Sequence, residues 1–285
     1  MTQTAPGKTT STIVRAPGMA ERDPVRHGRW QRAQELTLAF GLPLLLLSLW
    51  QFAASRGAID ERLFPPPLRV AQVAWQEFND ADFYGELRIS LGRMLAGFGI
   101  GVASGIIVGV LMGISRLTHA ALDLLLSALY TVPKLALLPL FLIIFGIGET
   151  PLVLMIAITV FFFMWIETME AIRGVSPAYL EPILVYRRSR WQTFWHALWP
   201  ASLPRIFVGL KVSAAVSVLT LVAVEFLQAS EGVGHNIWFS WSLFRADQMY
   251  FGIALVSMIG VAFTKLIEAL GYLAMPWMRK RVKGH

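Results

Sequence analysis

Residues 91–114 read LGRMLAGFGIGVASGIIVGVLMGI, a mostly apolar stretch that is long enough to cross a membrane. Four of its glycines recur at intervals of four residues: Gly101, Gly105, Gly109 and Gly113. That spacing puts them on one face of a helix, where a second backbone can approach closely. Such faces hold helices together in lipid, where the hydrophobic effect does not drive their association. The stretch therefore predicts a tightly packed bundle of membrane helices.

The composition of the whole chain agrees with a polytopic, all-α membrane protein. Of its 285 residues 55% are hydrophobic and only 15% are charged, whereas charged residues make up about a quarter of a soluble domain. The absence of cysteine excludes a disulfide framework, a thiolate metal site and thiol catalysis. The net charge is +7, and the basic residues lie beside the apolar runs, where they orient membrane helices. We therefore expect the lipid bilayer as a partner and no nucleic acid.

Apolar runs predict six membrane-spanning helices at residues 36–54, 91–114, 122–145, 151–166, 206–227 and 251–273. Six lysines and arginines precede the first span and an acidic excess follows it, so the positive-inside rule puts both termini in the cytoplasm. The segment after the first span should contain a short amphipathic helix over residues 68–78. We divide the chain into a disordered cytoplasmic tail (1–35), a first helix with its periplasmic connection (36–86), a transmembrane domain (87–278) and a basic cytoplasmic tail (279–285).

The third span carries the clearest irregularity. Pro133 and Pro139 interrupt it, and a proline inside a helix removes one hydrogen bond and clashes with the preceding turn, so we expect a kink. Lys134, between the prolines, either attracts an anionic substrate from an aqueous cavity or serves a structural purpose by snorkelling or pairing. Together with Glu225 near the outer end of the fifth span, these three residues are the candidates for a translocation path.

Two glycine-bearing turns are predicted on the outer side. The first contains Gly146, Gly148 and Glu149 and follows the third span, and the second contains Gly232 and Gly234 and follows the fifth. Both are candidate periplasmic turns.

A polar, arginine-bearing stretch, Glu170–Pro204, separates the fourth and fifth spans. Its composition predicts a helical unit over residues 178–185 and a second over residues 190–198, which Pro200 should end. The second unit has an apolar stripe at spacings of three and four, made of Trp191, Phe194, Trp195 and Leu198. An amphipathic helix pair of this kind can rest on the membrane or fill a groove on a partner protein, and composition alone does not choose between them.

This stretch resembles the cytoplasmic coupling-loop motif of permease subunits of bacterial ATP-binding-cassette importers, which reads E-A-A, three residues, G, nine residues, I-x-L-P. The motif aligns with Glu181, Pro182 and Ile183, and then with Arg187 at the glycine position and Pro200 at its end. The resemblance implies that this stretch couples the membrane helices to an ATPase. Its arginines contact either acidic residues of that ATPase or lipid head groups: Arg187, Arg188 and Arg190.

Further segments resemble the branch of these permeases that serves nitrate, sulfonates, taurine and bicarbonate. In order and spacing they cover about residues 65–280: Ser90–Arg93, Ala96–Phe98, Pro133–Leu140, Phe145–Glu149, Pro200–Pro204, Val224–Leu227 and Gly232–Gly234. The resemblance implies the type I importer permease (MetI-like) fold, with coupling helices between helices 4 and 5, in the bacterial inner membrane. It further implies a second copy of the chain, two ATPase subunits and an extracytoplasmic binding protein.

The implied function is transport of a small anion such as nitrate, a sulfonate or taurine. No cofactor is expected on this chain, because it contains no complete phosphate-binding loop. ATP and Mg would therefore bind the separate ATPase, and this chain would not be an enzyme. An uncharged or cationic nutrient, such as a vitamin precursor, is an alternative substrate.

A membrane-embedded enzyme or a non-transporting scaffold is a further alternative, since several charged residues lie in or beside the spans. The sequence contains neither H-E-x-x-H nor G-x-S-x-G. Lys265 and Glu268 are three residues apart on one helical face, so we expect them to neutralise each other.

Overall fold

The structure, a computed structural model, describes residues 24–176, 179 and 189–278. Within these ranges it contains helices and no strand, as the all-α prediction requires. The chain forms two compact units, Met1–Glu61 and Arg62–His285, and each is described by itself.

The first unit contains one long helix, α2 (Pro24–Ser55). Its apolar part, Gln34–Ser55, is long enough to cross a membrane and confirms the first predicted span. The helix nevertheless begins within the segment that we expected to be disordered, so that prediction is wrong for residues 24–35. Proline suits the first turn of a helix, and the glutamines, arginines, alanine and leucine that follow are good helix formers that extend the spanning helix. Residues 1–23 of the predicted tail lie outside the description.

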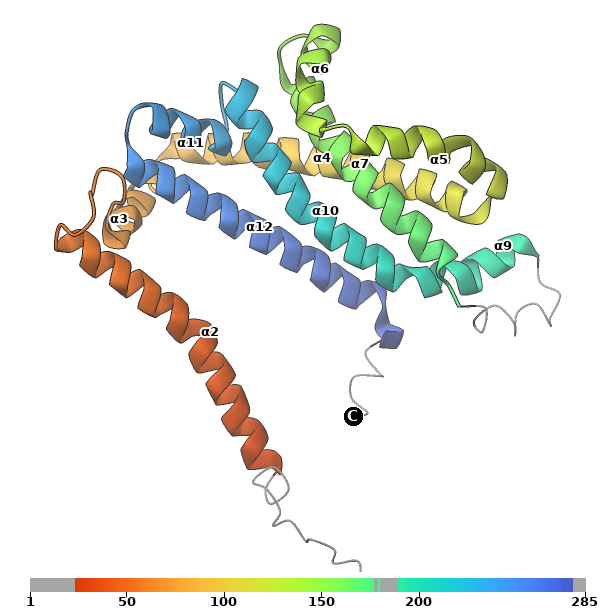
Figure 1. Cartoon of the computed structure of the whole chain (residues 1–285), viewed down its shortest axis with the longest axis horizontal. Helices are drawn as coiled ribbons and strands as arrows, with labels where there is room; N and C mark the ends of the chain where they lie inside the picture. Colours follow the sequence, from red (N-terminus) through yellow and green to blue (C-terminus); the bar gives the residue numbers. More distant parts are fainter. Residues whose placement is uncertain (1–23, 177–178, 180–188, 279–285) are drawn as a thin grey trace, which may run out of the picture. The chain divides into compact units, whose positions relative to one another are not determined.

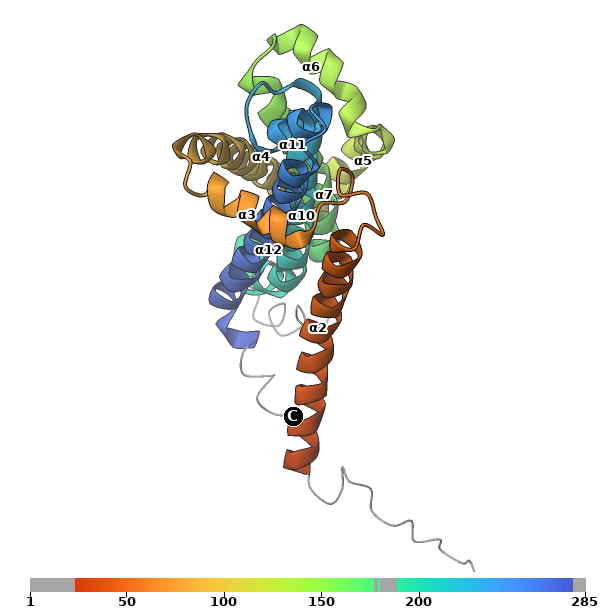
Figure 2. The same cartoon turned by 90° about the vertical axis from the view of Figure 1, so that its left-hand side faces the viewer.

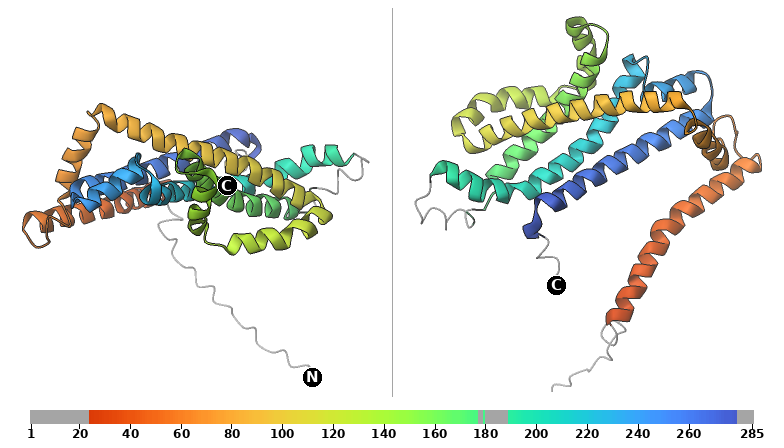
Figure 3. Two further views of the ribbon diagram at one scale, coloured as in Figure 1. Left: turned by 90° about the horizontal axis from the view of Figure 1, so that it is seen from above. Right: turned by 180° about the vertical axis from the view of Figure 1, so that it is seen from behind.

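The second unit holds the remaining helices, and four long ones lie side by side in it (Figures 1 and 3). Its elements are α3 (Pro67–Glu77), α4 (Ala81–Ile114), α5 (Arg116–Thr131), η1 (Lys134–Leu137), α6 (Leu138–Phe145), α7 (Glu149–Arg173), α9 (Arg190–Thr193), η2 (Phe194–Leu198), α10 (Trp199–Gln228), α11 (Val233–Ser242), α12 (Ala246–Ala274) and η3 (Pro276–Met278). Helix α3 confirms the predicted amphipathic helix.

The number of spans agrees with the prediction. Over the described residues, five helices are long and apolar enough to cross a membrane, and there are six if the bent pair of α5 and η1–α6 counts as one broken span. Helix α4 starts ten residues before the predicted span, because Asp80 caps it by accepting a hydrogen bond from the backbone N–H of Asp82.

The glycine face of α4, which consists of Gly97, Gly101, Gly105, Gly109 and Gly113, packs directly against α7. A Cβ atom at Gly101 would lie 2.5 Å from the carbonyl oxygen of Ala157, and one at Gly105 would lie 2.6 Å from the Cβ of Met164. Both distances are shorter than any tolerable contact, so the two backbones meet where only glycine fits. The predicted close approach is confirmed, and Gly97 extends the face by one further turn.

The third predicted span is broken more sharply than a kink. Helix α5 ends at Thr131, and the η1–α6 segment leaves it at 93° (Figure 2). Pro133 lies at the break and holds Val132 in an extended conformation, while Pro139 sits in the first turn of α6, where its missing N–H costs little. The two prolines thus end one helix and begin the next.

The second coupling unit does not end at Pro200, so that prediction is wrong. Residues Trp191–Gln228 form one continuous helix of 38 residues, made of α9, η2 and α10. The backbone N–H of Trp199 donates to the carbonyl of Phe194, five residues earlier, which is the hydrogen bond of a π turn. Pro200 follows directly after this π turn, as the second residue of α10. The wider turn accommodates the proline and the chain continues into the fifth span.

We expect Gly101→Ala to lower the free energy of unfolding by about 1–3 kcal/mol, because the added methyl group forces α4 away from α7. Gly99→Ala is the matched control: nothing lies within 4 Å of its Cβ position, and alanine is the better helix former. Thermal unfolding of the purified variants in detergent micelles measures both. Equal effects of the two substitutions would contradict the close packing at Gly101.

Candidate functional site

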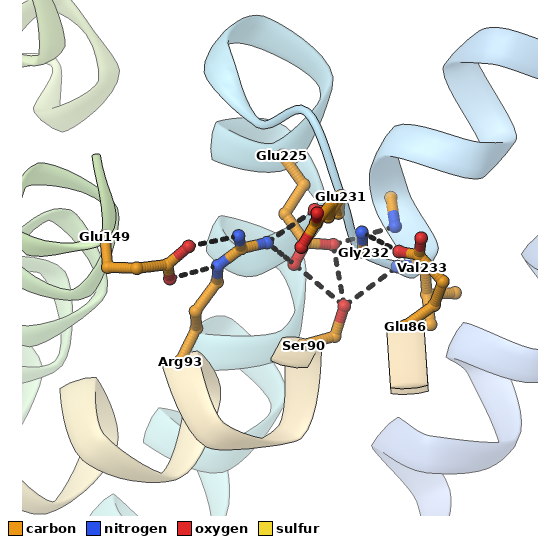
Figure 4. Close-up of polar contacts among 9 residues, drawn as sticks. Glu86, Ser90, Arg93, Glu149, Glu225, Glu231, Gly232 and Val233 are labelled. Carbon is orange, nitrogen blue, oxygen red and sulfur yellow. Dashed lines mark hydrogen bonds and ion pairs between the residues drawn. The ribbon is translucent and has the colours of Figure 1, made fainter. Parts of the chain in front are cut away.

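A buried arginine, Arg93 of α4, joins three other segments at one end of the bundle (Figure 4). Its guanidinium donates two hydrogen bonds of 2.6 Å to the carboxylate of Glu149, at the start of α7. The Nη1 atom donates to Glu225 Oε1 of α10 at 2.8 Å and to the carbonyl oxygen of Glu231 at 2.6 Å. Paired, bidentate geometry of this kind is the strongest that a guanidinium makes.

Glu225 is completely buried, and its carboxylate accepts hydrogen bonds from several groups. Besides Arg93, its carboxylate accepts from Ser90 Oγ at 2.8 Å and from the backbone N–H of Gly234 at 2.8 Å. Ser90 Oγ in turn accepts from the N–H of Val233 at 2.8 Å. We call Arg93, Glu149, Glu225, Ser90 and the turn that contacts them the arginine network. A buried charge is tolerated only when it is paired and hydrogen-bonded in this way.

The predicted outer turns form the frame of this network. Gly232 has φ +119°, and a Cβ atom there would lie 2.4 Å from Glu225 Oε1. Its N–H donates to the carboxylate of Glu86, and a Cβ at Gly234 would lie 2.8 Å from that of Glu225. In the other turn, Gly146 also has positive φ, +77°, and precedes Glu149. Glycine is required at Gly232 for both its conformation and its contact.

The structure thus brings together residues that we predicted from the sequence to belong to two separate sites, the translocation path and the periplasmic turns. Glu225, a candidate for the translocation path, has no exposed surface in this structure and lies with the turn residues. Arg93, Ser90 and Glu86 were not predicted as site residues. The signal for Arg93 was available, because a charged residue inside an apolar span marks a functional or paired group.

Lys134 has local partners for its charge. Its ammonium group donates to the carbonyl oxygens of Leu129, Tyr130 and Val132 at 3.2, 2.6 and 2.8 Å, and lies 4.5 Å from the ring centroid of Phe162. The carbonyls of Leu129 and Tyr130 belong to the last turn of α5, and that of Val132 follows it. Carbonyl groups at a helix end lack the i+4 donors of the helix interior, so they can accept from such a side chain. These contacts are those of the structural alternative, in which Lys134 closes the end of a broken helix.

At the opposite end of α10, aromatic side chains gather on the surface. The rings of Trp191, Phe194, Trp195 and Trp199 lie in mutual contact, with centroid distances between 5.4 and 6.2 Å. Trp191 is 69% exposed and Trp195 is 47% exposed. We call these four residues the aromatic cluster. Trp191, Phe194 and Trp195 belong to the apolar stripe that the sequence predicts, whereas Trp199 takes the place of the predicted Leu198 in the cluster.

A reciprocal pair of hydrogen bonds fixes the start of this helix. The N–H of Gln192 donates to Ser189 Oγ, and the N–H of Ser189 donates to Gln192 Oε1. This is a capping box, which satisfies two N–H groups that a helix start otherwise leaves unpaired. The aromatic cluster therefore begins at a defined residue.

The remaining coupling residues are only partly covered by the structure. Glu181, Pro182, Ile183, Arg187 and Arg188 lie outside the described residues. Two candidates are placed: Arg190 begins α9, and Pro200 lies at the start of α10.

Comparisons with known proteins place this chain among transport proteins. Residues 101–283 match the family "Binding-protein-dependent transport system inner membrane component". The putative aliphatic sulfonates transport permease protein SsuC of Bacillus subtilis is 31% identical, over 80% of this chain and 83% of its own length. The taurine transport system permease protein TauC of Escherichia coli is 31% identical, over 87% of this chain and 92% of its own length. The nitrate import permease protein NrtB of Leptolyngbya laminosa is 29% identical, over 81% of this chain and 85% of its own length.

Two solved structures share the fold. A chain of the MetNI methionine transporter, crystallised in inward-facing conformations, superposes with a TM-score of 0.55 at 18% identity, covering 64% of this chain and 92% of its own. A chain of an amino acid ABC transporter with histidines superposes with a TM-score of 0.56 at 16% sequence identity, and the match covers 71% of this chain and 96% of that one. The MetI-like fold expected from the sequence is therefore confirmed.

We expect Arg93→Met to lower the free energy of unfolding by about 3–5 kcal/mol, because it leaves the buried Glu225 carboxylate without its cation. The double variant Arg93→Met/Glu225→Gln should lose less than the sum of the two single losses, since it removes both charges of the pair. Ser90→Ala, which removes one hydrogen-bonding hydroxyl, should cost only about 1 kcal/mol. Thermal unfolding of the purified variants in detergent micelles ranks their losses in the free energy of unfolding. If the loss of the double variant equals the sum of the two single losses, the two charges do not stabilise each other.

Proposed function

The chain belongs to the family of binding-protein-dependent transport system inner membrane components, and we propose that two copies of it enclose the translocation path of an ATP-driven importer for a small anion. It is a membrane-spanning permease subunit of the nitrate, sulfonate and taurine branch and not an enzyme. It is a multi-pass protein of the inner membrane. In the proposal the aromatic cluster and both termini face the cytoplasm, and the arginine network faces the outer side.

One observation carries the mechanism: a single helix of 38 residues, Trp191–Gln228, has the aromatic cluster at one end and Glu225 at the other. At 1.5 Å per residue this helix is roughly 57 Å long. The arginine network fastens its far end to α4 and α7. A force applied at Trp191 is thus transmitted along one element to a point where three helices are tied together.

The partner that applies this force is a cytoplasmic ATPase subunit, two copies of which bind ATP and Mg and serve the two permeases. Exposed aromatic side chains on an amphipathic helix suit a groove on a protein, because tryptophan supplies much of the energy at interface centres. The stretch that contains Glu181, Pro182, Ile183, Arg187 and Arg188 completes the docking surface in this proposal. Closure of the ATPase pair would then tilt α10 together with the helices fastened to it.

The substrate is a small anion delivered by an extracytoplasmic binding protein. This part of the proposal is supported by the relatives, whose names specify aliphatic sulfonates, taurine and nitrate. Lys134 contributes indirectly in the proposal, by shaping the break between α5 and α6.

We expect Trp191→Ala to reduce copurification of the ATPase subunit at least about tenfold, because it removes a large exposed anchor from the docking surface. Trp75→Ala is the matched control, since Trp75 is 74% exposed but lies on α3. Pull-down of the coexpressed subunits from detergent extracts, with the permease bearing the tag, measures the ratio. Retention of the ATPase at the wild-type level by Trp191→Ala would contradict docking through the aromatic cluster.

We expect proteoliposomes that contain the permease, its ATPase and its binding protein to accumulate radiolabelled taurine, ethanesulfonate or nitrate when ATP is supplied on the ATPase side. A complex with a Walker A lysine substitution in the ATPase is the control for passive leakage. Selective ATP-driven uptake of an uncharged solute or a cation instead would overturn the assignment of an anionic substrate.

A further inference from the structure

A small polar pocket lies where α3, α11 and the starts of α4 and α12 meet (Figure 1). Its volume is about 230 Å³, which is less than the roughly 300–1,000 Å³ of sites for drug-sized molecules, so it suits one small group. The buried part of its wall is apolar and includes Phe83, Phe251 and Leu255. Its polar lining residues are Glu77, Glu86, Asn236, Ser240, Arg245 and Gln248.

The pocket lies at the level of lipid head groups. Arg245 comes six residues before the predicted span at 251–273, and Glu86 comes five residues before the span at 91–114. At 1.5 Å per residue, both are within about 10 Å of the edge of the apolar core. Trp75 of α3 is 74% exposed and Trp241 of α11 is 56% exposed, and exposed tryptophans gather at the interface between membrane and water. The elements around the pocket are therefore in contact with the head groups.

Several charged side chains of the second unit have partners in the same chain. Lys265 Nζ lies 3.0 Å from Glu268 Oε2, which confirms the predicted pair, and Lys211 Nζ lies 3.5 Å from the same oxygen. Close to the pocket, Arg69 Nε of α3 lies 3.1 Å from Asp247 Oδ2 of α12. Such pairs require no ligand.

The pocket, in contrast, contains two opposite charges that are not paired. Among the described residues, neither the carboxylate of Glu77 nor the guanidinium of Arg245 has an ion-pair or hydrogen-bond partner. Burial, and secondly the nearby charge of Asp80, raises the pKa of the Glu77 carboxyl above its ordinary value. A cation beside Glu77 would offset both causes.

These charges are complementary to a group that carries both signs. Glu77 attracts an ammonium group, and the planar fork of Arg245 suits two oxygens of one phosphate. A purely anionic group is disfavoured, because the pocket has two carboxylates, Glu77 and Glu86, against one guanidinium. The amides of Asn236 and Gln248 offer further hydrogen bonds to phosphate oxygens.

We propose that this pocket binds the head group of a zwitterionic phospholipid with a primary ammonium group, such as phosphatidylethanolamine. The phosphate pairs with Arg245, the ammonium group donates to Glu77, and the acyl chains stay in the bilayer. The site is distinct from the translocation path and does not depend on the identity of the transported solute. A soluble zwitterion has the same charges, but the position of the pocket among head groups favours the lipid.

The carboxylate of Glu86 links this pocket to the arginine network. It lines the pocket and also accepts a hydrogen bond from the N–H of Gly232, which belongs to the turn that encloses Glu225. A bound head group therefore contacts a residue that holds this turn. It also bridges α3 and α12, as the pair of Arg69 and Asp247 does. The lipid would thus stabilise this end of the bundle.

Native mass spectrometry of the purified full-length chain in detergent micelles tests the site. Dioleoyl phosphatidylethanolamine, phosphatidylcholine and phosphatidylglycerol are added at equal concentrations, and the first bound lipid is quantified. We expect the affinity for phosphatidylethanolamine to be at least about fivefold higher than for the other two. Phosphatidylcholine has no N–H to donate to Glu77, and phosphatidylglycerol has no ammonium group.

We expect Glu77→Gln and Arg245→Gln each to lower the affinity for phosphatidylethanolamine at least about fivefold, since each removes one charge-assisted contact. Arg245→Lys keeps the charge and should lose less. The matched controls are Asp82→Asn and Arg88→Gln, exposed residues of α4 that do not line the pocket, and they should bind like the wild type. Thermal unfolding without added lipid shows that each variant is folded, and the lipid series on the wild type decides if a variant is not.

Three results would overturn the proposal. Equal binding of phosphatidylglycerol or phosphatidylcholine by the wild type would show that the head group is not selected. Equally tight binding of glycerophosphoethanolamine, the soluble head group, would show that the pocket takes a free zwitterion and needs no lipid. If Glu77→Gln and Arg245→Gln keep the lipid but lose copurification of the binding protein, the pocket is a docking surface for that protein. Each result is independent of the uptake assay.

Discussion

The contact between the glycine face of α4 and α7 is the constraint on which the rest of this bundle depends. Where Gly101 meets the carbonyl of Ala157 there is no room for a side chain, so the two backbones are held at one distance and one rotation. In lipid, where burial of apolar surface gives no net advantage, such close packing is what selects one arrangement of helices over others. Residues near the ends of α4 and α7 are consequently brought to fixed positions.

The arginine network is built on that fixed frame. Arg93 lies one turn before Gly97 on α4, and Glu149 begins α7, so the packing of the two helices already sets their pairing. Glu225 then adds α10 and accepts hydrogen bonds from Ser90 and from the N–H of Gly234. The N–H groups of Gly232 and Val233 donate to Glu86 and Ser90 instead. Packing and polar contacts are therefore complementary. The glycines position the helices, and the buried charges permit only the correct third partner, since a misplaced helix would leave a carboxylate unpaired.

Much of this fold is predictable from local sequence, and the exceptions have physical causes. Hydropathy locates each span, and the interval of four residues locates the face of α4. The local sequence does not predict which charged residues pair with one another. Arg93, Glu149 and Glu225 are each separated from the next by more than fifty residues along the chain, yet they form one network. Pro200 misled the prediction because a proline normally ends a helix, whereas here a π turn at Phe194–Leu198 absorbs it. Whether one wider turn replaces a helix end depends on tertiary packing and not on the proline itself.

This continuity past Pro200 changes what the charges on α10 can do. Because the aromatic cluster, Lys211 and Glu225 lie on the same continuous helix, they move together if that helix tilts. The end that contains Glu225 is fastened by the arginine network, so tilting displaces the middle of the helix by less than its free end. Lys211 and Lys265 share Glu268 across the gap between α10 and α12, and relative movement of the two helices alters this shared contact. The shared contact at Glu268 is thereby linked to the position of the helix end at Trp191.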